Sequence, residues 1–396
     1  MNGVQRRWLG MSWLVTLLLI VGVLAAATTA AAKLAGKEVK LGALIPTTGA
    51  VAHNGLQQVI AMNMAMEEIN AAGGVGGLPL RIIMYDTASK SETSIQAARK
   101  LIDADKVLAV LGPYLSSTTA VTFPVANRAA APIISSSAAA PGLSASNRPW
   151  SFRNVMTSEK LNGPVVEKWL KAYPQIKRVA VATDVKDFFS KTYGKDVMPA
   201  LLKANGVEVG LETDFVTTDI DFSAQVTKVK HAKVDGVVLA GLQAASANFL
   251  REMRRQGVMV PAIGGVSLSV PEFVHLAKKD AEGVYTVGSF WAENPDPKVR
   301  RFVAEYIKRD KKGDKPMNTT ANLYDTIFVT KTCIETSGVT NRPEDLASDR
   351  QKIRDCWANL KDYTGVGGRT AMGLDGDAVK EAFIFVVKDG DYVRLP

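Results

Sequence analysis

The sequence predicts an α/β protein made of two lobes, each built on a doubly wound parallel sheet. Three observations lead to this prediction. Apolar segments of strand length alternate with helical segments along almost the whole chain from residue 38, which is the pattern of a doubly wound sheet. The 396 residues exceed one ordinary domain and suit two. Several predicted strands also stop abruptly at small or hydroxyl-bearing residues, as buried parallel strands do before a crossover helix.

The expected elements follow one another with short connections. The first strand, at 39–45, ends at Pro46, and a helix with apolar residues at helical spacing follows the loop 47–55 and stops at Gly73-Gly74. Further strands are expected at 80–85, 107–111, 132–134, 178–183, 207–209, 234–240, 262–265 and 284–289, with helices at 95–102, 165–172, 191–204, 222–231, 244–256, 299–309 and 320–336. A closing hairpin is expected at 382–388 and 392–395, because Asp389-Gly390 is a favoured turn dipeptide.

Two of the strand ends are rich in hydroxyl groups. The strand at 107–111 runs into the serines and threonines of 116–119, and the strand at 132–134 runs into the three serines of 135–137. Free backbone N–H groups point outward at the start of a following helix, where they suit a carboxylate or another anionic or carbonyl group. Simple capping of the helix by serine is the alternative interpretation.

The loops at the ends of the strands are expected to form a binding site. Small molecules bind open α/β sheets outside the carboxyl ends of the strands, and for two facing lobes this region is the cleft between them. Six loops of this type are expected to converge on one cavity, at 47–55, 112–119, 135–141, 184–190, 241–245 and 264–269.

No arrangement of catalytic or metal-ligating residues accompanies these loops. The three histidines, His53, His231 and His275, are scattered along the chain, and no G-x-S-x-G nucleophile elbow is present. A three-ligand metal site and a histidine-based triad are therefore both disfavoured. We expect no enzyme, no metal and no cofactor, but a site that holds a small molecule without changing it.

The two cysteines, Cys333 and Cys356, lie near the C-terminus. In an oxidising compartment they can bridge two neighbouring helices, and a disulfide is the favoured interpretation. Two buried thiols are the alternative.

Residues 1–32 have the three-part pattern of a secretory signal peptide. Arg6 and Arg7 precede an apolar run at 8–27, and small residues follow up to residue 32. An uncleaved membrane anchor is the alternative, since the run is almost long enough to span a bilayer. Cleavage would take the formal net charge from +9 to +7 (9 − 2). The remaining basic residues are interspersed with acids, which argues against a nucleic-acid partner.

Several short segments together resemble a known family. They are the helix end Glu67-Glu68-Ile69-Asn70-Ala71-Ala72-Gly73-Gly74-Val75, Tyr85-Asp86, Gly112 with Ser116-Ser117-Thr118, Asp221-Phe222-Ser223, Leu250-Arg251 with Gly257, Tyr324-Asp325 and Gly376-Asp377-Ala378. Over nearly all of the mature chain, the sequence resembles the periplasmic solute-binding proteins of branched-chain amino acid and amide uptake systems (the Leu/Ile/Val-binding type), which have the type I periplasmic binding-protein fold.

The resemblance implies a periplasmic protein that captures a small solute by hinge closure and delivers it to an inner-membrane ABC permease. Three hinge crossings link the two lobes of such proteins. By similarity, 38–157 and 289–369 form the N-terminal lobe, whereas 158–288 and 370–396 form the C-terminal lobe. We expect a monomer that does not span the membrane once the signal peptide is cleaved.

The resemblance also assigns candidate ligand contacts in the N-terminal lobe. Ser116 stands where the family places a serine that binds the ligand carboxylate, and Ser117 beside it is a second candidate. Ser137, Ala138 and Ala139 occupy the second strand-end loop, where Ala139 would serve through its backbone N–H.

Other cleft positions depart from the family pattern, although Phe189, or Phe188 next to it, falls near its cleft-closing aromatic residue. The acid that usually neutralises the ligand ammonium aligns with Val266, and aromatic residues of the pocket align with Leu242, Thr319 and Asn54. A buried ammonium without a paired anion is costly.

An ordinary α-amino acid would therefore need another acceptor in this protein, such as Asp184 or Asp187. A carboxylate or an amide without an ammonium is at least as plausible a solute. Solute capture for transport is the leading hypothesis. A ligand sensor that presents its solute to a membrane receptor and, last, a secreted hydrolase are the alternatives.

Overall fold

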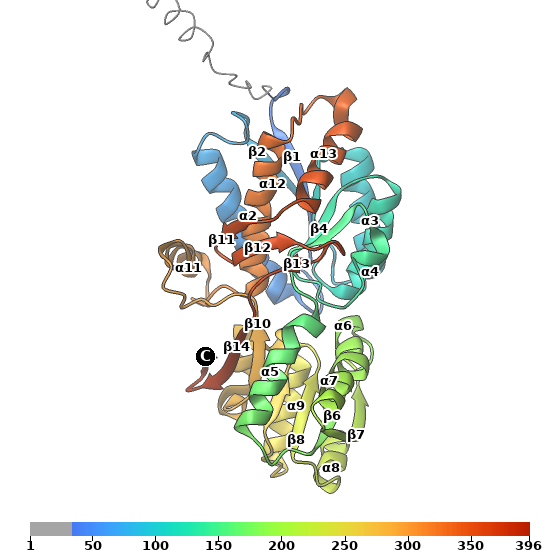
Figure 1. Cartoon of the computed structure of the whole chain (residues 1–396), viewed down its shortest axis with the longest axis vertical. Coiled ribbons are helices and arrows are strands. Elements are labelled where there is room, and N and C mark those ends of the chain that lie inside the picture. Colours follow the sequence, from blue (N-terminus) through green and yellow to red (C-terminus); the bar gives the residue numbers. More distant parts are fainter. Residues whose placement is uncertain (1–33) are drawn as a thin grey trace, which may run out of the picture. The chain divides into compact units, whose positions relative to one another are not determined.

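The computed structural model describes residues 34–396, so the predicted signal peptide at 1–32 lies outside the described residues. Within this part, strands and helices alternate along the chain and form two separate large β-sheets (Figure 1). Among residues 34–396, every helix is too short or too polar to cross a bilayer.

Five parallel strands form the sheet of the N-terminal lobe, in the order β2-β1-β3-β4-β5. They are β1 (Val39–Ile45), β2 (Leu80–Asp86), β3 (Val110–Leu111), β4 (Ile133–Ser135) and β5 (Ser151–Arg153). The sequence analysis did not predict β5, because three residues are too few to show a strand periodicity. It forms through pairing with β4, with Ser151 opposite Ile133 and Arg153 opposite Ser135.

Helices cover both faces of this sheet. One face carries α2 (Ala52–Ala71), α12 (Asn318–Thr336) and α13 (Leu346–Ala358), and the other carries α3 (Ser91–Arg99) and α4 (Ser116–Arg128) (Figure 1). Helix α11 (Pro297–Arg309) packs against α2. Strand β1 shows why both faces are covered. Leu41 and Ala43 pack with the first group of helices while Leu44 packs with the second, since successive side chains of a strand point to opposite faces.

Seven strands form the sheet of the C-terminal lobe, in the order β15-β14-β10-β9-β8-β6-β7. They are β6 (Arg178–Asp184), β7 (Glu208–Phe215), β8 (Gly236–Ala240), β9 (Ala262–Gly264), β10 (Tyr285–Gly288), β14 (Phe383–Lys388) and β15 (Asp391–Leu395). The first five are parallel, and β14 and β15 add the expected antiparallel hairpin. Asp389 and Gly390 both have positive φ, at 52° and 78°, as the favoured two-residue hairpin turn requires.

Helices also cover both faces of the second sheet. One face packs against α5 (Ser158–Ala172) and α7 (Met198–Ala204), and the other against α8 (Ser223–His231), α9 (Gln243–Arg255) and α10 (Pro271–Ala277). A short helix, α6 (Phe188–Thr192), follows β6. The sequence analysis placed the start of α8 at Phe222. The helix instead starts one residue later, and Asp221 accepts a hydrogen bond from the Ser223 N–H at 2.9 Å.

The chain passes between the two sheets three times: after β5, after β10 and before β14. A small antiparallel sheet of β11 (Tyr363–Gly365), β12 (Gly368–Met372) and β13 (Ala378–Val379) precedes the last passage. It lies against the N-terminal lobe, because the N–H groups of Val366 and Gly367 donate to Asp325 of α12 at 2.8 and 2.7 Å. The residue limits of the two lobes stay a proposal. The contacts with Asp325 favour a boundary between the second N-terminal-lobe segment and the final C-terminal-lobe segment near residue 380 rather than near residue 370.

A buried ion pair joins the first passage to the third. The Arg153 guanidinium donates through Nε and Nη2 to the two oxygens of Asp377, each at 2.6 Å. Its Nη1 donates to the carbonyls of Ala138, at 2.9 Å, and Ala140. Arg153 therefore holds the loop after β4 in place while it anchors the residues before β13.

A disulfide joins Cys333 of α12 to Cys356 of α13. The two cysteines are 23 residues apart, and closing a loop of this length restricts the unfolded chain. We expect the double variant Cys333→Ala/Cys356→Ala to lose about 3 kcal/mol of unfolding free energy. Urea unfolding of both proteins under oxidising conditions measures this loss. Equal unfolding free energies would contradict it.

Lys380 is buried at the third passage and gives a prediction about pH. Its Nζ donates to the side-chain oxygens of Asn154, at 3.1 Å, and Asn322, at 2.9 Å. Burial lowers the pKa of Lys380 from its ordinary 10.5 to about 8, against the opposing attraction of the Asp325 charge. Folding therefore favours the neutral amine of Lys380 over its ammonium form. The contribution of Lys380 to the unfolding free energy is fully present above its pKa in the unfolded chain, and it is lost as the pH falls through its folded pKa of about 8.

We expect the unfolding free energy of the wild-type protein to rise between about pH 8 and about pH 10 relative to that of Lys380→Gln. Asp325 does not contribute in this window, because burial raises its pKa only to about 6. Urea unfolding of both proteins at the two pH values measures the difference. A constant difference between them would contradict the assignment.

Candidate functional site

A cavity of about 60 Å³ lies between the loops that follow the strands of both sheets. All six loops expected to converge contribute residues to it, and the start of α12 adds Asn318 and Thr319. The convergence of the loops is therefore confirmed, whereas occupation of the cavity by a solute stays a prediction.

The structure brings most of the predicted ligand-contacting residues together. Eight line the cavity, namely Asn54, Ser116, Ser137, Ala139, Phe189, Leu242, Val266 and Thr319. Phe189, rather than the exposed Phe188 beside it, is the aromatic residue that faces the cavity. It stacks on Tyr193 with ring planes 9° apart.

Ser117 and Ala138 are not among the lining residues. Ser117 is the second residue of α4, whose first residue, Ser116, faces the cavity. Ala138 is buried, its N–H donates to the Ser135 hydroxyl at 3.1 Å, and its carbonyl accepts from Arg153. Both backbone polar groups of Ala138 are thus hydrogen-bonded within the protein. The roles of Ser117 and Ala138 as ligand contacts stay predictions.

Three hydroxyl oxygens of the cavity each accept a hydrogen bond from a fixed neighbour. Ser116 Oγ accepts from the Ala140 N–H at 3.3 Å, and Ser137 Oγ accepts from Gln58 Nε2 at 3.0 Å. Tyr114 Oη accepts from Asn54 Nδ2 at 2.9 Å. A hydroxyl has one proton to donate beside its acceptor lone pairs. Ser116 Oγ makes no other hydrogen bond with residues 34–396, so its proton is free for a group in the cavity. Ser137 Oγ also lies 3.4 Å from Ser136 Oγ, and either hydroxyl can be the donor of that bond.

Serine does not cap α4 in the way the alternative interpretation required. The residue before the helix is Leu115, which makes no side-chain capping hydrogen bond. The Leu115 carbonyl instead accepts from the hydroxyls of Thr118 and Thr119, at 2.9 and 2.8 Å. Ser116 is left to join the loop after β4 through its bond to Ala140.

A chain of amides crosses the cavity from one lobe to the other. Gln243 Nε2 at the start of α9 donates to Asn54 Oδ1 of α2 at 2.6 Å, and Asn54 in turn donates to Tyr114. Glu272 of α10 accepts a second bond from Gln243 Nε2 at 2.8 Å. Burial raises the pKa of the Tyr114 phenol to about 12, so its oxygen stays protonated at neutral pH.

The lining has no net charge. Of the residues that the structure describes, all those that line the cavity are neutral. Asp184 and Asp187, considered above as acceptors for an ammonium, lie outside it. The Asp187 carboxylate caps α6 by accepting from the Ser190 N–H and hydroxyl at 2.8 and 2.7 Å, and Asp184 accepts from the N–H groups of Lys186 and Asp187 and from the Thr217 hydroxyl.

Two lining residues at the start of α12 carry buried polar atoms without a protein partner. Neither the oxygen nor the nitrogen of the Asn318 side-chain amide makes a hydrogen bond with residues 34–396, and the same holds for Thr319 Oγ1. Asn318 is 4% exposed and Thr319 is 7% exposed. Buried polar groups are normally paired, so these atoms indicate a site for an additional molecule.

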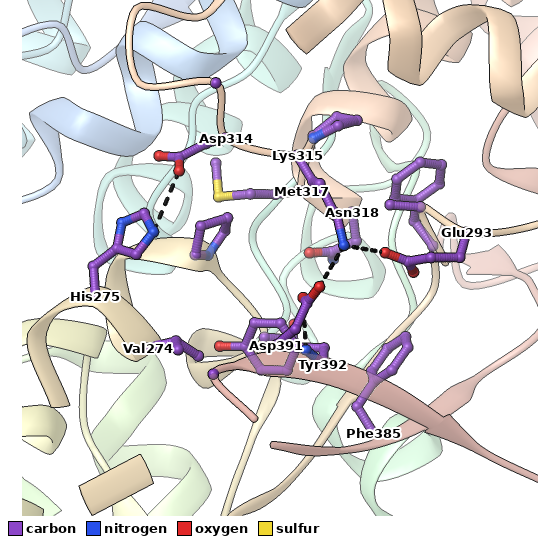
Figure 2. Close-up of a pocket in the computed structure, with 17 residues that line it drawn as sticks. Val274, His275, Glu293, Asp314, Lys315, Met317, Asn318, Phe385, Asp391 and Tyr392 are labelled. Atoms are coloured by element: carbon purple, nitrogen blue, oxygen red, sulfur yellow. Dashed lines mark hydrogen bonds and ion pairs between the residues drawn. The ribbon is translucent and has the colours of Figure 1, made fainter. Parts of the chain in front are cut away.

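A second cavity, of about 240 Å³, shares Asn318 with the first (Figure 2). Figure 2 shows Lys315 between Glu293 and Asp391, with which it forms ion pairs, and His275 directed at Asp314. The His275 Nε2 to Asp314 Oδ1 distance is 3.4 Å. The Asp391 and His275 contacts join residues of the C-terminal lobe to residues of the N-terminal lobe. The His53 Nε2 to Asp314 Oδ2 distance is 4.0 Å, and His53 lines neither cavity.

The sequence analysis missed part of the lining. Tyr114, Gln243 and Ser267 lie in loops that were expected at the cavity, but no local pattern distinguishes them there. Only their position in the sequence could have identified them as lining residues, since each is within two residues of a predicted contact. The other missed residues are Val51, Leu115, Val270 and Asn318.

Comparison with known proteins agrees with this architecture. A family model described as periplasmic binding protein matches residues 38–391, so the chain belongs to the periplasmic binding protein family. The Leu/Ile/Val-binding protein BraC3 of Rhizobium johnstonii is 26% identical over 363 residues, which are 90% of this chain and 93% of that protein. The resemblance to branched-chain amino acid-type binding proteins is confirmed.

Two solved structures share the fold. The branched-chain amino acid transporter substrate binding protein LivJ of Streptococcus pneumoniae, in complex with isoleucine, has a TM-score of 0.79 and 24% identity, covering 91% of this chain and all of that one. A solute binding protein of an ABC transporter from Rhodopseudomonas palustris BisB5, in complex with 3,4-dihydroxy benzoic acid, has a TM-score of 0.78 and 21% identity, covering 90% of this chain and 96% of that one. The type I periplasmic binding-protein fold is therefore confirmed.

Proposed function

We propose that the protein is the periplasmic solute-binding component of an ABC uptake system, exported through its signal peptide and acting as a monomer. It captures a small amino acid-like, amide or carboxylate solute in the 60 Å³ cavity and passes it unchanged to an inner-membrane permease. The observation that carries this proposal is the convergence of six strand-end loops, three from each lobe, on one neutral cavity that contains unpartnered polar atoms.

Closure of the lobes around the solute is the proposed mechanism. Ser116, Ser137 and Tyr114 belong to the N-terminal lobe, and Phe189 and Leu242 belong to the C-terminal lobe. A solute that touches both sets stabilises the closed arrangement and shifts the hinge equilibrium toward it. The Gln243 to Asn54 hydrogen bond and the Lys315 to Asp391 ion pair also form across the lobes.

The chemistry of the lining supports binding without reaction. A hydrolase needs a base to activate its nucleophile, and no histidine or carboxylate is found among the described residues that line the cavity. The hydroxyls of Ser116 and Ser137 accept from an amide N–H and a glutamine amide, neither of which can take up a proton.

Calorimetric titration of the refolded protein tests the proposal. The exported protein is unfolded in denaturant, dialysed to remove any bound solute and refolded. A panel of small carboxylates, amides and amino acids is then titrated into it. We expect one saturable solute with a stoichiometry of one, recovered chemically unchanged after the titration. Failure of the whole panel to bind, or conversion of the bound compound, would contradict the proposal.

Uptake in cells tests the transporter partnership separately. A strain that lacks this protein should lose uptake of the solute identified by calorimetry and regain it when the gene is restored. Unchanged uptake in that strain would contradict the role in transport and favour the sensor hypothesis.

A further inference from the structure

The hydrogen-bonding groups of the N-terminal lobe present donors to the cavity. The hydroxyl proton of Ser116 remains free, because its oxygen makes one hydrogen bond and accepts in it, from the Ala140 N–H. Ser137 Oγ accepts from Gln58 Nε2 and lies 3.4 Å from Ser136 Oγ, so its proton is free when Ser136 is the donor of that bond. Among residues 34–396, no acceptor faces the Ala139 N–H. Ser116 is also the first residue of α4, a 13-residue helix, where backbone N–H groups and the helix dipole favour negative charge.

The C-terminal lobe presents an apolar wall to the same cavity. Phe189, Leu242, Val266 and Val270 supply it. The polar residues of this lobe that line the cavity, Gln243 and Ser267, direct their donors elsewhere. Gln243 donates to Asn54 and Glu272, and Ser267 donates to the Gly241 carbonyl at 2.9 Å.

The described residues that line the cavity offer no charged partner to an ammonium group. No described lining residue is an acid, and Asp184 and Asp187 accept hydrogen bonds from their own loop and helix. The nearby Glu272 does not line the cavity, and its carboxylate accepts from Gln243 Nε2 at 2.8 Å. The free acceptors are neutral, chiefly the Asn318 side-chain oxygen. The free energy of desolvating a buried ammonium exceeds the free energy regained from hydrogen bonds to neutral partners.

We infer that the solute is a small carboxylic acid with an apolar body and no ammonium group, bound with its carboxylate toward the N-terminal lobe. This inference rests on the proposed function. The carboxylate accepts from Ser116, Ser137 and the Ala139 N–H, and the body packs against Phe189 and Val266 of the other lobe. Asn318, with both amide atoms unpaired, accommodates one neutral oxygen substituent on the body, such as a hydroxyl or oxo group.

The test compares compounds that share one body and differ in charge. The refolded protein is titrated with 4-methylpentanoate, L-leucine and 4-methylpentanamide, and in parallel with 3-phenylpropanoate, L-phenylalanine and 3-phenylpropanamide. We expect an acid to bind best. Its amino derivative should bind roughly 100-fold more weakly, because its ammonium is left unpaired. Its amide should bind about 10-fold more weakly, because an NH₂ group would face donors.

A matched pair of variants places the effect at the cavity. Val266 is a half-buried lining residue, so Val266→Glu adds a negative charge and Val266→Gln adds the same bulk without one. We expect Val266→Glu to weaken the best acid at least about 10-fold and to narrow or reverse its advantage over the amino derivative. Val266→Gln should preserve the preference for the acid. Thermal unfolding of both variants confirms that they are folded.

The outcomes separate the two proposals. Tightest binding by an amino acid or an amide would overturn the inferred solute class and leave solute capture standing. An unchanged preference for the acid in folded Val266→Glu would also overturn the inference, since the charge would then not meet the solute. Failure of these compounds and of the wider panel to bind would overturn the proposed function itself, and the inference with it.

Discussion

Replacement of Asp377 by alanine is expected to lower the free energy of unfolding by about 3–5 kcal/mol. Arg153, its partner, is 0% exposed, and Asp377 is 2% exposed. Two hydrogen bonds of 2.6 Å join them. Removing the carboxylate leaves a buried guanidinium without a counter-charge, and such a group is far more costly than the paired ions.

Two control variants distinguish this effect from a general loss of charge. Arg153→Met/Asp377→Leu removes both ions and should be less destabilised than Asp377→Ala alone, although it also loses the bonds of Arg153 to Ala138 and Ala140. Asp362→Ala breaks an exposed pair with Arg369 and should cost no more than about 1 kcal/mol. Urea unfolding of the three variants gives the comparison. Equal losses in Asp377→Ala and Asp362→Ala would show that the buried pair has no special role.

Replacement of Ser116 by alanine is expected to weaken solute binding about 10- to 100-fold. The Ser116 hydroxyl lines the cavity and retains its proton after accepting from Ala140. A hydrogen bond to a charged group contributes roughly 1.5–3 kcal/mol, which corresponds to that change in dissociation constant. Calorimetric titration of the solute into wild-type and variant protein measures the effect.

Ser117→Ala is the matched control for this prediction. Ser117 is adjacent in sequence and also lies in the first turn of α4, yet it does not line the cavity. Its removal should change the affinity by no more than about twofold. Equal affinities of wild-type and Ser116→Ala protein would exclude Ser116 from the site, and a Ser117→Ala effect of the same size would show that the helix start, rather than the hydroxyl, is responsible.

The architecture and the location of the site could be predicted from the sequence because both depend on local patterns. Buried strands such as Val39–Ile45 show continuous apolar residues, and the ends of parallel strands must meet at one edge. This rule placed Ser116 and Ser137 together although 21 residues (137 − 116) separate them. The hairpin at Asp389-Gly390 was equally predictable, since its turn depends on two residues.

Contacts that depend on the fit between the lobes could not be predicted. Gln243 and Asn54 are 189 residues apart, and nothing near either residue specifies the other. The role of Arg153 as the anchor of the loop after β4 was missed for the same reason, since Asp377 lies 224 residues away. The short strand Ala378–Val379 exists because of such tertiary contacts and has too few residues to show a pattern.

Small-angle scattering of the refolded protein, without solute and then saturated with the best-binding acid, tests solute capture by hinge closure most directly. Because the cavity is lined by both lobes, we predict a smaller radius of gyration in the saturated protein. Identical scattering curves at a concentration that calorimetry shows to be saturating would contradict capture by closure.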